Sequence, residues 1–100
     1  MSRRKRYREQ RVTRPSIFVL GETANYSYRA AQHPARNVIV KASPKNTDLC
    51  WVESGRAAVE DECWPLLPGE TVTMPVYNTG DVNVLFKAAN SRLFVFFDNP

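Results

Sequence analysis

The feature of this sequence that most constrains its fold is the steady recurrence of turn residues after Pro15, with no run of helical period between them. Isolated glycines and clusters of Pro, Asn, Ser and Asp recur about every 8 to 12 residues, which is typical of a sandwich or barrel. The predicted strands are residues 16–20, 23–29, 37–42, 49–53, 58–64, 71–76, 82–88 and 92–97. We therefore predict an all-β fold, a small antiparallel β-sandwich that is jelly-roll-like and has about eight short strands.

Alternation in the last two predicted strands separates a core face from an outer face. The inward set is Val82, Val84, Phe86, Leu93, Val95 and Phe97. Phe94 and Phe96 then point the other way, because successive side chains of a strand alternate between faces. Two outward phenylalanines need a cover, from the rest of the body or from a neighbouring subunit. We favour the subunit interface and predict Phe94 and Phe96 as partner-binding residues.

The middle of the chain contains a predicted hairpin. Residues 49–53 and 58–64 flank a turn at Gly55, and their pairing would bring Cys50 and Cys63 near each other. Two cysteines are too few for a disulfide scaffold, and their separation matches no common zinc spacing. We assign neither thiol a catalytic or metal-binding role.

Charge is distributed unevenly along the chain. Up to Arg14 there are seven basic residues and one acidic residue, a net charge of +6, whereas the remainder has seven basic and nine acidic residues, a net charge of −2. The basic set is Arg3, Arg4, Lys5, Arg6, Arg8, Arg11 and Arg14. We predict that residues 1–15 form an extended basic N-terminal arm and residues 16–100 the sandwich domain. Guanidinium groups suit phosphates and carboxylates alike, so the arm is predicted to bind an acidic partner, protein or nucleic acid.

The residue types that enzymes use do not form a recognisable constellation. The single histidine, His33, lies beside Pro34 in a predicted loop without a nucleophile at an interpretable spacing. Residues 60–62 are all acidic, but they alternate between faces in a strand and so do not converge on a cation. The four glycines are isolated, which gives no phosphate-binding loop. We expect a non-enzymatic protein with no catalytic residues, metal site or cofactor.

The sequence also bears on the localisation of the protein. No apolar stretch approaches the roughly 18 residues that a membrane span needs, and no apolar segment follows the basic N-terminus as in a secretory signal. We therefore expect no membrane partner and synthesis in the cytoplasm.

Four short motifs resemble the small β-sandwich modules of tailed-bacteriophage virion proteins, such as capsid decoration (cement) proteins and fibre or spike base modules. They are Arg36-Asn37-Val38-Ile39-Val40, Leu66-Leu67-Pro68-Gly69-Glu70, Asp81-Val82-Asn83-Val84-Leu85-Phe86-Lys87 and Arg92-Leu93-Phe94-Val95. The resemblance covers about two thirds of the chain, from residue 36 to 97. The sequence departs from the pattern in its two Cys-Trp pairs, at 50–51 and 63–64, and in its arm.

The resemblance implies a structural protein of the virion, assembled in the host cytoplasm. It implies a symmetric homo-oligomer, a trimer being favoured, and a decoration protein that stabilises the head by bridging major capsid subunits through its arm and sandwich. The alternative, which rests on the arm alone, is a nucleic-acid-binding coat or regulatory protein that places its arginines on phosphates.

Overall fold

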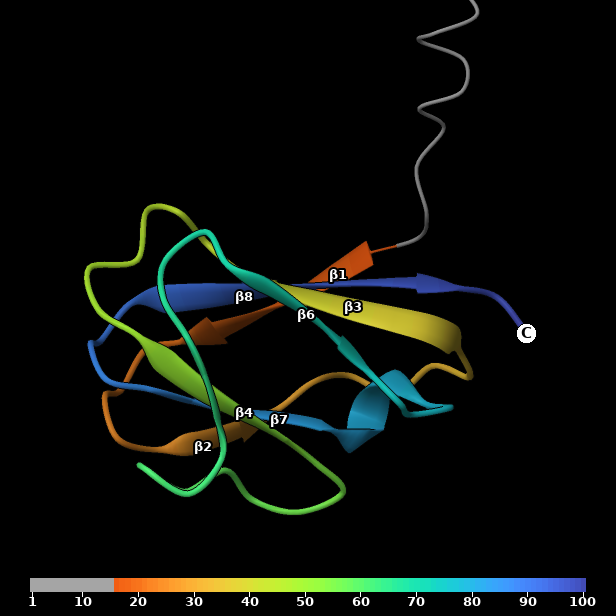
Figure 1. Ribbon diagram of the computed structural model, residues 1–100, viewed down its shortest axis with the longest axis horizontal. Coiled ribbons are helices and arrows are strands. Elements are labelled where there is room, and N and C mark those ends of the chain that lie inside the picture. Colours follow the sequence, from red (N-terminus) through yellow and green to blue (C-terminus); the bar gives the residue numbers. More distant parts are fainter. Residues whose placement is uncertain (1–15) are drawn as a thin grey trace, which may run out of the picture.

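A computed structural model describes residues 16–100, which form two four-stranded antiparallel sheets packed face to face (Figure 1). The strands are β1 (Ser16–Gly21), β2 (Ser27–Arg29), β3 (Arg36–Ala42), β4 (Cys50–Ser54), β5 (Trp64–Leu66), β6 (Thr71–Met74), β7 (Val82–Phe86) and β8 (Ser91–Asp98), with a 3-10 turn, η1 (Thr79–Asp81), before β7. The all-β sandwich of about eight strands predicted from the sequence is confirmed.

The order of the strands defines the topology. Sheet A has the order β1-β8-β3-β6 and sheet B the order β2-β7-β4-β5. Only β4 and β5 are neighbours both in the chain and in a sheet, so almost every connection crosses from one sheet to the other. This is the order of a jelly roll, in which two Greek keys fold over each other. The jelly-roll-like architecture expected from the sequence is therefore the one observed.

The core lies between the two sheets and consists of the side chains that alternation predicted. All six members of the predicted inward set are buried, and Phe86, Val84 and Leu93 are fully so. Gly21 ends β1 directly against the ring of Phe86, and a Cβ at this position would overlap that ring. The close approach of the two sheets here therefore requires glycine.

The predicted hairpin between residues 49–53 and 58–64 is wrong. β4 pairs instead with β5, so that Cys50 lies opposite Leu66 and Val52 opposite Trp64. Residues 55–63 leave the sheet as a loop, and Asp61 in it has a positive φ of 65°, which a regular strand excludes. Cys50 points into the core while Cys63 lies on the loop, and both are free thiols.

The predicted strand 23–29 is shorter than expected. Only Ser27–Arg29 pairs with β7, because Asn25 adopts a φ of 60° and turns the chain before it. The Asn25 backbone N–H donates to the carbonyl oxygen of Phe86, which anchors this turn on sheet B. Within residues 16–100, no helix has the length and apolar character of a membrane span.

Candidate interaction surface

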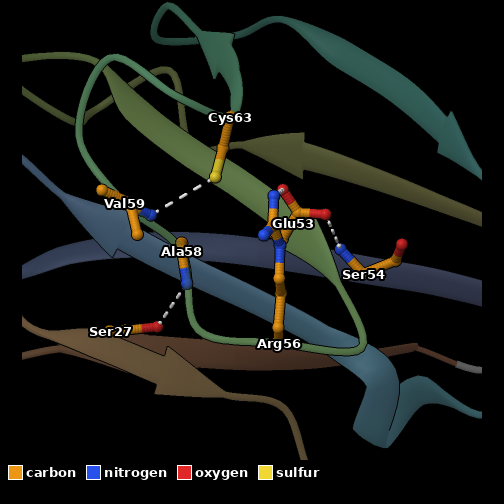
Figure 2. Close-up of polar contacts among 7 residues, drawn as sticks. All are labelled: Ser27, Glu53, Ser54, Arg56, Ala58, Val59 and Cys63. Carbon is orange, nitrogen blue, oxygen red and sulfur yellow. Dashed lines mark hydrogen bonds and ion pairs between the residues drawn. The ribbon is translucent and has the colours of Figure 1, made fainter.

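The outer face of sheet B is covered by the chain's own loop, residues 55–63, which we term the covering loop. In Figure 1 it runs along the side of β4 and β7 that faces away from sheet A. Ala58 is buried in it against Trp51 and Leu85, which point outward from β4 and β7. The Ala58 N–H donates to the Ser27 hydroxyl oxygen of β2 over 2.9 Å (Figure 2). The loop therefore closes the apolar outer surface of this sheet.

Polar contacts of Glu53 and Cys63 fix the two ends of the covering loop (Figure 2). The thiol of Cys63 hydrogen-bonds the Glu53 carboxylate, and this contact is the main cause that lowers the pKa of Glu53. Arg56 adds an ion pair of 3.5 Å to the same carboxylate, and the Val59 N–H donates to the Cys63 sulfur over 3.3 Å. Burial raises the pKa of the Cys63 thiol, so it stays protonated and able to donate at neutral pH.

A second ion pair ties the covering loop to β7. The Lys87 ammonium lies 2.9 Å from the Glu60 carboxylate, and this contact raises the pKa of Lys87. The same ammonium lies 5.9 Å from the ring centroid of Trp51. The acidic run at 60–62 thus includes one carboxylate already paired with a cation of its own chain.

The outer face of sheet A carries a group of apolar side chains that we term the aromatic face. Its members are Phe18 and Leu20 of β1, Ile39 of β3, and Phe94 and Phe96 of β8. The register sets them in rows across three strands: Phe18 lies opposite Phe94, and Phe96 lies opposite Ile39. The ring centroids of Phe18 and Phe94 are 6.5 Å apart, as are those of Phe94 and Phe96.

The aromatic face is accessible to a partner. Phe18 is 55% exposed and Leu20 38% exposed, while Phe94 and Phe96 are half-buried against their neighbours. Within residues 16–100, no loop lies over this face as the covering loop does over sheet B (Figure 1). The predicted outward orientation of Phe94 and Phe96 is confirmed, and their role in a subunit interface stays a prediction.

Three cations surround the aromatic face. The Arg92 guanidinium lies 5.3 Å from the ring centroid of Phe18, and Lys41 lies opposite Phe94 in the next strand. Lys45 joins Arg92 and Phe94 in a depression of about 530 Å³, none of whose lining residues is acidic. Within residues 16–100, none of the three cations forms an ion pair, unlike Arg56 and Lys87 on the other side of the molecule.

Asn46 positions Lys45 beside Arg92. Its side chain is buried, donates to the Arg92 carbonyl oxygen over 2.9 Å and accepts from the Arg92 N–H over 2.8 Å. The Asn46 amide thus hydrogen-bonds the backbone of β8 as a neighbouring strand would. This role of Asn46 is not predictable from the sequence, because a Ser-Pro-Lys-Asn turn does not indicate which strand it will lie beside.

A second exposed apolar surface lies where the two sheets end in β5 and β6. A groove of about 210 Å³ opens there between Trp64 of β5 and the side chains of Val72, Met74 and Pro75. We term it the edge groove. Trp64 is 59% exposed, and Tyr77, which lines a neighbouring depression together with Pro75, is 84% exposed.

The remaining candidates from the sequence are the basic residues of the arm, His33 and the possible metal ligands. Arg3, Arg4, Lys5, Arg6, Arg8, Arg11 and Arg14 lie outside the described residues. His33 is exposed, with its ring stacked at 5.7 Å on Phe97. In residues 16–100, no group of three or more His, Cys, Asp or Glu side chains is placed to hold a metal ion. Comparison with protein-family models, with curated proteins and with solved structures gives no match for this chain.

Proposed function

We propose that this protein is a non-enzymatic structural protein of a bacteriophage virion, a capsid decoration (cement) protein that bridges major capsid subunits through its arm and its sandwich. The observation that carries the proposal is the exposed aromatic edge around the edge groove. Trp64 and Tyr77 flank Pro75 there. Large aromatic side chains beside a groove are the residues that dominate protein–protein interfaces.

The fold and the phage resemblance add weaker support. Jelly rolls occur in viral capsid proteins, although also in lectins and cupins, so the fold by itself assigns no function. The four motifs that resemble phage modules fall on β3, the β5–β6 turn, β7 and β8. In such a subunit the arm would act as a tether, because many weak contacts become strong when they are linked in a shell. A symmetric assembly, with a trimer favoured, belongs to the same proposal.

The proposal is tested in particles of the phage that encodes the chain. The gene is replaced by full-length variants, and the protein in gradient-purified particles is measured by mass spectrometry relative to the major capsid protein. Changing Arg3, Arg4, Lys5, Arg6 and Arg8 to Ser should reduce incorporation at least about tenfold, because the arm's charge is lost. The double change Trp64→Ser and Tyr77→Ser should reduce it similarly, since exposed aromatic anchors contribute most of an interface's affinity.

Tyr26→Ser is the matched control. Tyr26 is 59% exposed, but it directly precedes β2 and lies away from the edge groove. It should leave incorporation unchanged. Absence of the wild-type chain from purified particles would refute the virion proposal outright. Full incorporation of the arm variant would show that the arm does not contribute to docking on the particle.

A nucleic-acid-binding protein is the second candidate function. The specific observation in its favour is that Lys41, Lys45 and Arg92 cluster beside exposed aromatic rings without a carboxylate partner among residues 16–100. In the sequence, this alternative rests on the arm alone. The aromatic face gives it a surface on the folded domain.

A further inference from the structure

We propose that the aromatic face of sheet A, with Lys41, Lys45 and Arg92, binds single-stranded nucleic acid. Bases would stack on the exposed phenylalanine rings, and phosphates would contact the three cations. The surface consists of outward side chains of β1, β8 and β3, together with the 43–46 turn that carries Lys45. It is separate from the edge groove on β5 and β6.

Charge complementarity favours a polyanion on this face. The domain has a net charge of −2. On the sheet B side, Arg56 and Lys87 are paired with Glu53 and Glu60, and Arg29 donates to the Gly80 carbonyl oxygen, whereas among residues 16–100 the three cations beside the aromatic face have no carboxylate partner. Along β8 the nearest acidic residue is Asp98, one row beyond Phe96, where it accepts a hydrogen bond from Asn37. A partner with regularly spaced negative charges meets these cations without bringing a competing positive charge.

The rings favour a single strand over a duplex. Sequence-tolerant binding of single strands combines a basic surface with aromatic side chains on which successive bases stack. Outward positions 92, 94 and 96 of β8 read Arg, Phe, Phe, and Phe18 extends the row onto β1. In a duplex the bases are stacked on each other and cannot reach these rings, so the phenylalanines would add nothing to phosphate contacts.

Two other occupants fit the face less well. A second copy docked through the same face would bring two sets of unpaired cations together, which costs free energy. An acidic protein surface would satisfy the cations and cover the rings, but it does not offer a series of flat rings that can stack along the row of phenylalanines, whose centroids are 6.5 Å apart.

The inference does not depend on the virion proposal. That proposal rests on Trp64 and Tyr77, and the present one on Phe18, Phe94 and the cations beside them. Changes at one surface leave the other intact, so either proposal can fail without the other.

The experiment measures binding of the full chain to a fluorescent oligothymidylate of about 20 nucleotides by anisotropy over a salt series. A DNA duplex of the same length and poly-glutamate are the comparison probes. We expect tighter binding to the single strand than to either. The triple variant Lys41→Gln, Lys45→Gln and Arg92→Gln should make the slope of log affinity against log salt shallower by about 2, since each phosphate contact on a single strand contributes about 0.7.

Ring variants separate stacking from charge. Phe18→Leu and Phe94→Leu keep the apolar packing of sheet A but remove the stacking surface. Each should weaken binding of the single strand at least about fivefold and leave the salt slope unchanged. Trp64→Leu and Arg56→Gln are the matched controls, an exposed aromatic and an exposed cation on other surfaces. Both should bind as the wild type does.

An amide spectrum of the isotopically labelled wild-type chain keeps the test independent of any variant's folding. Addition of the oligothymidylate should shift resonances of β1, β8 and the 43–46 turn. The inference is overturned if those resonances stay in place, if the face variants bind as tightly as the wild type, or if the duplex binds as tightly as the single strand. Equal binding of poly-glutamate with the same dependence on Phe94 would assign the face to an acidic protein and also overturn it.

Discussion

Sheet B and sheet A both send large apolar side chains outward, but within residues 16–100 a loop of the chain covers only those of sheet B. Trp51 and Leu85 of sheet B are 4% and 8% exposed beneath the covering loop, whereas Phe18 of sheet A is 55% exposed. Arg56 and Lys87 on the sheet B side form ion pairs, and within residues 16–100 the three cations beside the aromatic face do not. One outer face is thus completed within the domain, and the other has the composition of a binding surface.

The largest expected effect contrasts one buried and one exposed aromatic residue. Trp51→Ala should lower the free energy of unfolding by about 3 to 5 kcal/mol, because it leaves a cavity beneath the covering loop. Phe94→Ala on the outer face of sheet A should cost only about 1 kcal/mol. Urea denaturation of the two variants provides the measurement. Equal losses of unfolding free energy in the two variants would show that the outer faces of the two sheets contribute equally to the stability of the fold, which would contradict the contrast between them.

The two thiols distinguish opening of the covering loop from unfolding of the core. Burial raises the pKa of the Cys50 thiol to about 12, from an ordinary value of 9.0. At a given pH below 9 this reduces its thiolate fraction about a thousandfold, and the core also blocks the reagent. Cys63 lies half-buried on the loop. A thiol reagent should therefore modify Cys63 in the folded protein and Cys50 only on global unfolding.

Single-thiol variants allow the labelling rate of each cysteine to be measured separately. Cys63→Ser leaves only Cys50, and Cys50→Ala leaves only Cys63, so each labelling rate is followed alone by mass spectrometry at increasing urea concentration. The rate of Cys50 should follow the global transition. If Cys50 were labelled in native conditions as fast as Cys63, the covering loop would have no opening reaction of its own.

A smaller effect is expected from the contact between β2 and the covering loop. Ser27→Ala removes the oxygen that accepts from the Ala58 N–H, and it should cost about 1 kcal/mol. The same change should speed labelling of Cys63, because the loop is held less firmly. Ser16→Ala, at the exposed start of β1, is the control and should alter neither quantity. Unchanged labelling of Cys63 in Ser27→Ala would show that the Ser27 hydroxyl does not help to hold the loop closed.

The sequence predicts what local alternation decides, and it fails where distant contacts decide. The strands at 37–42 and 92–97 and the outward orientation of Phe94 and Phe96 follow from turn residues and period-two patterning. The region 58–64 is also predicted to be a strand, yet residues 58–63 form a loop, in which Ala58 packs on Trp51 and Leu85 from other parts of the chain.

The aromatic face depends on strand order in the same way. That Phe18 and Lys41 lie beside Phe94 follows from β8 being placed between β1 and β3. Arg92 gains Lys45 as a neighbour through the Ser43 N–H and the side chain of Asn46, which both hydrogen-bond its backbone. The two outward phenylalanines of β8 are therefore predictable from the sequence, whereas the cations beside them are not.

The smallest expected effect is a pH dependence of the covering loop through Glu53. The Cys63 thiol, and then Ser54 and Arg56, hold the pKa of this carboxyl below its ordinary value of 4.5. The folded state therefore binds the proton more weakly than the unfolded state does. The stabilisation is complete above about pH 4.5 and is lost as the pH falls through the lower folded-state pKa.

Urea denaturation between about pH 3 and pH 6 should show that the free energy of unfolding declines as the pH falls. Glu53→Gln should make this decline less steep, since a carboxamide does not titrate. Glu62→Gln, at an exposed position of the same loop, should keep the wild-type decline. Identical profiles for the wild type and Glu53→Gln would mean that the loop is closed by Ala58 and Trp51 without help from this carboxylate.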